Sequence, residues 1–119
     1  MGPQIAFLAE AGRSQPMDAF VVICGDFNFP RGTKMYDEMI EKSGFFDPLA
    51  NDPRPTYQPV SFLKKTWTLP LDFFFCRQPK MNTLKVSADI QMMVNPESHF
   101  PYGHFLSDHF AIILNLEKE

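Results

Sequence analysis

Residues 19–28 read Ala-Phe-Val-Val-Ile-Cys-Gly-Asp-Phe-Asn, a run of six apolar residues followed by a glycine and then by polar side chains. The run Ala19–Cys24 has the length and the β-branched content of a strand, and its apolar and polar residues do not alternate. Such a pattern is typical of a strand buried on both faces. We therefore predict a core strand that carries Asp26 and Asn28 at its end, where open sheets place their ligands.

Around this run the sequence predicts few helices and several strands. Residues 5–11 have the pattern of an amphipathic helix that stops at Gly12, and a second helix should follow between Thr33 as N-cap and Gly44 as C-cap. Residues 47–59 contain four prolines and predict a long loop. Further strands are predicted at residues 71–76, 84–92 and 110–116.

Composition limits the chain to one small globular domain. It has 119 residues, of which 45% are hydrophobic and 21% charged. Its net charge of −3 lacks the basic excess of a dedicated nucleic-acid binder, which favours a substrate other than duplex DNA. The two cysteines, Cys24 and Cys76, lie in apolar runs and are expected to be buried free thiols.

Neither a signal peptide nor a membrane span is predicted. The first residues lack the basic region and long apolar run of a leader, and no apolar run approaches the roughly 20 residues that cross a bilayer. This leans toward a cytoplasmic location and leaves the localisation open.

Three short segments contain the residue types of a catalytic site. In an extended chain Asp26 and Asn28 point the same way, although Gly, Asp and Asn are also turn formers. Asp72 lies in the apolar run 71–76, where a carboxylate needs a cationic or donor partner, and a histidine fits best. Asp108 and His109 directly precede the last predicted strand. We predict that Asp72 and His109 are hydrogen-bonded neighbours.

The segments Gly25-Asp-Phe-Asn28, Leu71-Asp-Phe73 and Ser107-Asp-His109 resemble those of the endonuclease/exonuclease/phosphatase family, in the same order. That family includes apurinic endonucleases, neutral sphingomyelinases, inositol-phosphate phosphatases and DNase I-like nucleases. The resemblance extends from about residue 19 to the C-terminus. It implies an α/β (α+β) fold, namely half of a four-layered DNase I-like β-sandwich flanked by helices, with mainly antiparallel sheet. Residues 1–119 would form a single partial domain, the C-terminal half of the catalytic domain.

The resemblance also implies a metal-dependent hydrolase of phosphodiester or phosphomonoester bonds. Asp26, Asn28, Asp72 and His109 would be the catalytic residues, and Asp26, Asn28 and Asp108 would hold Mg²⁺, with Mn²⁺ as the alternative ion. Asp26 would orient or deprotonate the attacking water, and Asn28 would hold the phosphate and help organise the metal. His109 would donate to the phosphoryl oxygens, while Asp72 would fix its tautomer and keep it cationic. Whether Asp26 or His109 is the base stays open.

Two features depart from the family. Position 73 is Phe where the family often has Tyr, and the first half of the family fold, with its metal-binding Glu, has no counterpart here. We therefore expect the isolated chain to be inactive or very weak. The substrate could be nucleic acid, a phospholipid or a small phosphate ester. The alternative is a non-catalytic truncated fragment that acts only as a folding or association module.

Two further expectations concern the surface and the histidines. Along the two core strands Phe20, Val22, Cys24, Phe73 and Phe75 are taken as one face, and one of the two faces should lack a cover. The missing N-terminal half, or a second copy of the chain, would supply that cover, so the isolated chain should self-associate. His99, His104 and His109 are spaced five apart, but we favour a loop over a zinc site because no Cys or Asp stands at ligand spacing.

Overall fold

The computed structural model describes residues 3–57, 69–91 and 109–119. Within them the predicted order of elements is confirmed, with shifts of one or two residues at most strand ends. The chain is a mixed α+β fold whose strand pairs are antiparallel. The elements are α1 (Pro3–Arg13), β1 (Val21–Asp26), α2 (Lys34–Ser43), β2 (Asp72–Arg77), β3 (Leu84–Gln91) and β4 (Ala111–Lys118).

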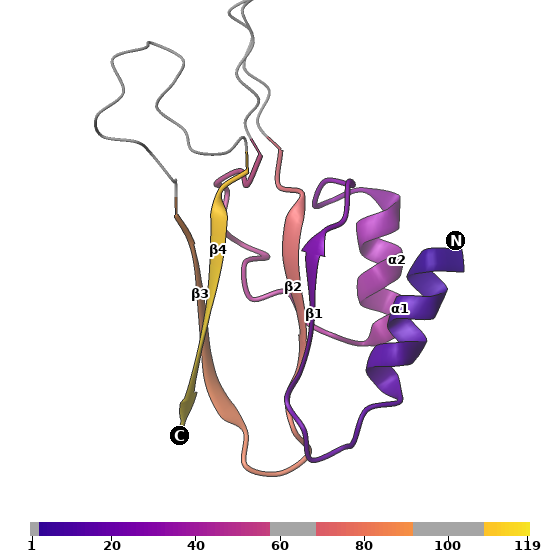
Figure 1. The fold of residues 1–119 in the computed structure, drawn as a ribbon, viewed down its shortest axis with the longest axis vertical. Helices are drawn as coiled ribbons and strands as arrows, with labels where there is room; N and C mark the ends of the chain where they lie inside the picture. The colour runs from indigo at the N-terminus through magenta and orange to yellow at the C-terminus, as the bar shows by residue number, and fades with distance from the viewer. Residues whose placement is uncertain (1–2, 58–68, 92–108) are drawn as a thin grey trace, which may run out of the picture.

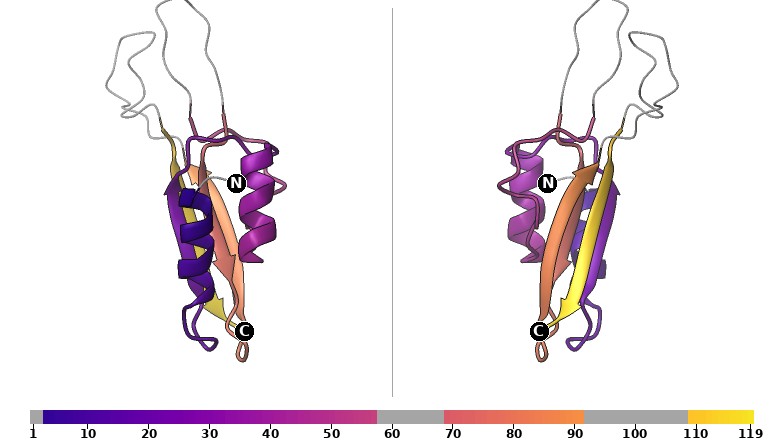
Figure 2. Two further views of the ribbon diagram at one scale, coloured as in Figure 1. Left: turned by 90° about the vertical axis from the view of Figure 1, so that its right-hand side faces the viewer. Right: turned by 90° about the vertical axis from the view of Figure 1, so that its left-hand side faces the viewer.

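The described strands form two two-stranded sheets, β1–β2 and β3–β4. Both helices lie on one side of the β1–β2 pair, and the β3–β4 pair lies on the other side (Figures 1 and 2). The end of β1 and the beginnings of β2 and β4 lie at the same end of the molecule, the upper end in Figure 1. This arrangement brings together Asp26, Asp72 and His109.

The main core lies between the helices and the β1–β2 sheet. Phe73 and Phe75 of β2 are fully buried there, and they contact Tyr36 of α2 ring against ring. Thr33 caps the start of α2 by accepting a hydrogen bond from the Tyr36 N–H, and Gly44 ends it in the left-handed conformation at φ 70°. Both predicted caps are confirmed.

Helix α1 does not stop at Gly12, as the sequence suggested, but runs through it to Arg13. The reason is a close approach of α1 to the core. A Cβ at position 12 would lie 2.8 Å from the ring of Phe45 and 2.9 Å from the Cδ1 of Ile23. The glycine therefore serves packing inside the helix and not helix termination.

The prediction that the first strand is buried on both faces is wrong. Val21 and Ile23 pack against the helix core, but Val22 and Cys24 are exposed. The helices cover only one face of β1, and no element in the described ranges covers those two side chains on the other. Strand β2 does have both faces buried, since every residue from Phe73 to Cys76 is buried.

The register corrects the predicted faces. Val22 lies opposite Cys76 and Cys24 opposite Phe74, so these four side chains share the face away from the helices. Phe73 and Phe75 instead share a face with Ile23, not with Val22 and Cys24 as predicted. The uncovered part of the sheet is therefore confined to the β1 half of one face.

The cysteines differ in the same way. Cys24 is exposed, against expectation, because it lies on the uncovered face of β1. Cys76 is buried, as predicted, and burial raises the pKa of its thiol to about 12. Its backbone pairs with Phe46 in both directions, at 2.8 Å each, on the edge of β2 away from β1. Cys76 is therefore a packing residue and not a nucleophile.

The loop 47–57 is ordered by charge pairs at both ends. The carboxylate of Asp47 is fully buried and accepts hydrogen bonds from Arg31 Nε at 2.9 Å and from the Tyr36 hydroxyl at 2.6 Å. Arg54 reaches β3, where its guanidinium donates to the Ile90 carbonyl at 3.1 Å and to Asp89. The loop thus connects α2 to the second sheet.

A smaller core underlies this second sheet. Leu49 of the loop, Ile90 of β3 and Phe110 are buried together, with Ile112 of β4 packed against them. Strand β3 alternates between more and less exposed side chains, as the sequence predicted. In the part of the chain that the structure describes, no helix is long and apolar enough to span a bilayer.

Candidate metal-dependent active site

Three polar side chains from separate segments meet where β1 ends. Asp26 is the last residue of β1 and lies opposite Asp72, the first residue of β2. His109 lies two residues before β4 and forms a β-bridge with Tyr57. Because strand partners lie about 5 Å apart, two carboxylates face each other here and need a cation or a donor between them.

His109 supplies that donor. Its Nδ1 lies 2.9 Å from Asp72 Oδ2, and its Nε2 lies 3.6 Å from Asp26 Oδ2. A carboxylate only accepts hydrogen bonds, so Nδ1 must carry a proton and donate a hydrogen bond to Asp72. Nε2 faces the carboxylate of Asp26. The predicted Asp72–His109 contact is confirmed.

Burial is graded across the three residues. The Asp72 side chain is 13% exposed, that of His109 31% and that of Asp26 36%. The innermost carboxylate is therefore the one that holds the imidazole, and the outermost is open to a ligand. This order suits Asp72 as the group that orients the imidazole and Asp26 as the group that contacts a ligand.

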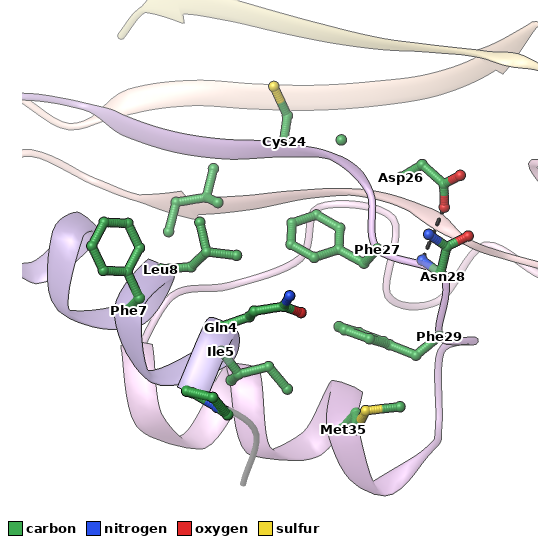
Figure 3. Close-up of a pocket in the computed structure, with 13 residues that line it drawn as sticks. Gln4, Ile5, Phe7, Leu8, Cys24, Asp26, Phe27, Asn28, Phe29 and Met35 are labelled. Carbon is green, nitrogen blue, oxygen red and sulfur yellow. Dashed lines mark hydrogen bonds between the residues drawn. The ribbon is translucent and has the colours of Figure 1, made fainter.

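Asp26 and Asn28 come together by a turn and not by the extended chain that the sequence suggested. Asn28 has a left-handed φ of 58°, and its backbone N–H donates to Asp26 Oδ1 at 2.9 Å. The alternative noted from the sequence, that Gly, Asp and Asn form a turn here, is therefore also correct. The bond occupies one oxygen of Asp26 and fixes the carboxylate, as Figure 3 shows.

Both residues line one hollow, as predicted. The hollow has a volume of about 830 Å³, which is within the usual range of ligand sites. Its other walls are mostly apolar side chains of α1 and of the segment after β1, among them Leu8, Phe27 and Phe29 (Figure 3). Asp72 and His109 do not line it, so Asp26 is the residue that joins the hollow to the His–Asp pair.

The polar cluster has the spacing of groups that could hold a metal ion. One ligand atom from each of Asp26, Asp72 and His109 can be chosen so that all three lie within 4.8 Å of one another. Two carboxylates beside a single imidazole leave negative charge for a cation, and carboxylate oxygens are ligands that Mg²⁺ and Mn²⁺ prefer. Among the predicted metal ligands, Asp26 has an oxygen that the turn does not use, and Asn28 lies beside it. The predicted ligand Asp108 lies outside the described residues.

Sequence reasoning missed two residues of this site. Thr56 is fully buried and contacts the beginnings of both β2 and β4, and the ring of Tyr57 lies 4.8 Å from that of His109. Both lie in the proline-rich loop, where nothing in the local pattern distinguishes them from other loop residues. Of the three histidines spaced five apart, His99 and His104 lie outside the described residues.

Comparison with protein-family models, with curated proteins and with solved structures finds no match to this chain.

Proposed function

We propose that this chain carries the phosphate-ester hydrolase site of a metal-dependent enzyme of the endonuclease/exonuclease/phosphatase type. The observation that supports this most is the junction of Asp26, Asp72 and His109, with His109 hydrogen-bonded to Asp72 at 2.9 Å and facing Asp26 at 3.6 Å. A partly buried His–Asp pair beside a more exposed carboxylate is an arrangement that serves proton transfer.

The residues would divide the work as follows. The open oxygen of Asp26 and the amide of Asn28 would hold Mg²⁺ or Mn²⁺, which supplies positive charge to the phosphate and acidifies bound water. Asp26 orients the attacking water. His109 in its doubly protonated form, held in place through Nδ1 by Asp72, would donate from its Nε2–H to a phosphoryl oxygen as negative charge develops there. Asn28 also contacts the phosphate. A DNase I-like four-layered sandwich would complete the cover of the β1–β2 sheet.

The proposal is tested by hydrolysis of a chromogenic phosphodiester with Mg²⁺ or Mn²⁺. The 119-residue chain should show little or no turnover. A longer protein that contains this chain together with the first half of the family fold should hydrolyse the substrate, and chelation with EDTA should abolish this activity. A longer chain that binds either metal yet hydrolyses neither phosphodiesters nor phosphomonoesters would contradict the proposal and favour a folding or association module.

A further inference from the structure

Thr56 joins the segments that carry the predicted site. Its hydroxyl oxygen accepts hydrogen bonds from the backbone N–H of Leu71 at 2.9 Å and from that of Asp72 at 3.0 Å. Its own N–H donates to the Leu69 carbonyl at 3.0 Å, and its carbonyl accepts from the Phe110 N–H at 2.7 Å. One residue thus uses its backbone and side chain on both sides of the site.

These hydrogen bonds are made by the backbone of Asp72 itself and by that of Phe110, the neighbour of His109. The Asp72 N–H belongs to the residue whose carboxylate holds His109, and Phe110 is the residue next to His109. Thr56 is fully buried, so water cannot substitute for its hydroxyl when the bond is lost. A hydroxyl oxygen has two acceptor sites, and the two N–H groups fill both. Thr56 therefore links the backbone of Asp72 to that of the residue after His109.

We propose that Thr56 is a positioning residue, which holds the backbones of Asp72 and of Phe110, the residue after His109, so that His109 Nδ1 donates to Asp72. Its importance for catalysis rests on the proposed function, but the positioning itself does not. The hydroxyl carries this role, since it is the group that binds the Asp72 backbone. Serine at position 56 should preserve it, and valine, which has the shape of threonine without the acceptor, should not.

The test measures the tautomer of His109 directly in the 119-residue chain. Long-range ¹H–¹⁵N correlation spectra at one mildly alkaline pH show which ring nitrogen carries the proton, and His109→Ala assigns the signals. Wild type and Thr56→Ser should show His109 protonated at Nδ1. Thr56→Val should lose this signature. Thr33→Val, which removes the hydroxyl that caps α2, is the matched control and should retain it.

Retention of the signature in Thr56→Val, or its loss in Thr56→Ser, would overturn the proposal. If Thr56→Val does not fold, amide hydrogen exchange in the wild-type chain decides. The N–H groups of Leu71 and Asp72 should then exchange much more slowly than those of exposed loop residues, and equal rates would overturn the proposal. The proposed function can fail in an enzyme assay without affecting the positioning role. A longer chain without hydrolysis, but with the same tautomer pattern, would remove the proposed function and leave the positioning role.

Discussion

The carboxylate of Asp72 is tolerated at the start of an apolar strand because His109 donates to it at 2.9 Å. Each of the two side chains thereby explains the position of the other. The same pair leaves Nε2 directed toward Asp26, the more exposed carboxylate. The consequences for rate and for packing can be tested one side chain at a time.

In a longer chain that shows hydrolase activity, His109→Ala and Asp26→Ala should each lower kcat by about 10² or more, because the proposed mechanism has each group act on the transition state. Circular dichroism should show an unchanged fold. Lys85→Ala, an exposed residue of β3, is the control and should leave kcat unchanged. Rates within a few-fold of wild type for both site variants would refute the assigned roles.

Gly12→Ala should destabilise the fold although alanine favours a helix. The new Cβ would lie 2.8 Å from the Phe45 ring, and overpacking of this kind costs about 1–3 kcal/mol, against about 1 kcal/mol gained from helix propensity. Urea unfolding measures the difference. Ala11→Gly, on the exposed neighbour, gives the propensity contribution alone. A Gly12→Ala chain more stable than wild type would show that α1 can move away from the core.

At the scale of elements, the buried carboxylate of Asp47 holds the loop to α2. Asp47→Ala should cost about 3–5 kcal/mol in the free energy of unfolding, because it leaves the largely buried Arg31 without its partner. Tyr36→Phe removes only the hydroxyl that donates to Asp47 at 2.6 Å, and should cost about 1 kcal/mol. Chemical denaturation compares the two. Equal losses would mean that the ion pair contributes nothing beyond the tyrosine bond.

The other end of the loop predicts a pH dependence. Hydrogen bonds from Arg54 lower the pKa of Asp52 to about 2 and also lower that of Asp89. A carboxyl whose pKa is lower in the folded state stabilises the fold above its unfolded value, near 4, and loses this contribution as the pH falls toward 2. Arg54→Met should therefore reduce stability at pH 6 and converge on wild type near pH 2. Urea unfolding across this range measures it, and a difference that does not change with pH would contradict the assignment.

The sequence predicted what local chemistry determines. The caps of α2 and the alternation of β3 depend on neighbours along the chain, so a pattern reveals them. The burial of β1 depends on which distant elements pack against its two faces. The same apolar run is found in strands buried on one face and in strands buried on both, so the pattern does not distinguish them. Thr56 escaped notice for the same reason, because its role depends on two distant strands. The Asp72–His109 pair could be predicted since burial of a carboxylate demands a partner.

On the scale of the whole molecule, an incomplete cover should lead to association. Val22 and Cys24 expose one face of β1, and Phe7 of α1 is 73% exposed beside the hollow. Within the described residues β1 pairs with β2 alone, and Val21–Cys24 bears no charge, whereas β3 carries Lys85 and Asp89. We expect the isolated chain to self-associate at micromolar concentration, as sedimentation or light scattering would show.

A matched pair of variants locates this contact. Val22→Lys places a charge on the exposed face of β1 and should yield a monomer. Met81→Lys, at a site that is 72% exposed in the turn before β3, should not change the association. A wild-type chain that is monomeric and binds no hydrophobic dye would show that β1 is covered in some other way.

The separation of the site residues along the chain has a consequence for folding kinetics. His109 and Asp72 are 37 residues apart, and a longer interval separates Asp72 from Asp26. Contacts between distant residues form slowly, because the intervening chain must close its loops first. The caps of α2, in contrast, lie within one turn of helix. In a refolding experiment α2 should therefore gain protection early, and the environment of His109 should reach its native state only in the last phase.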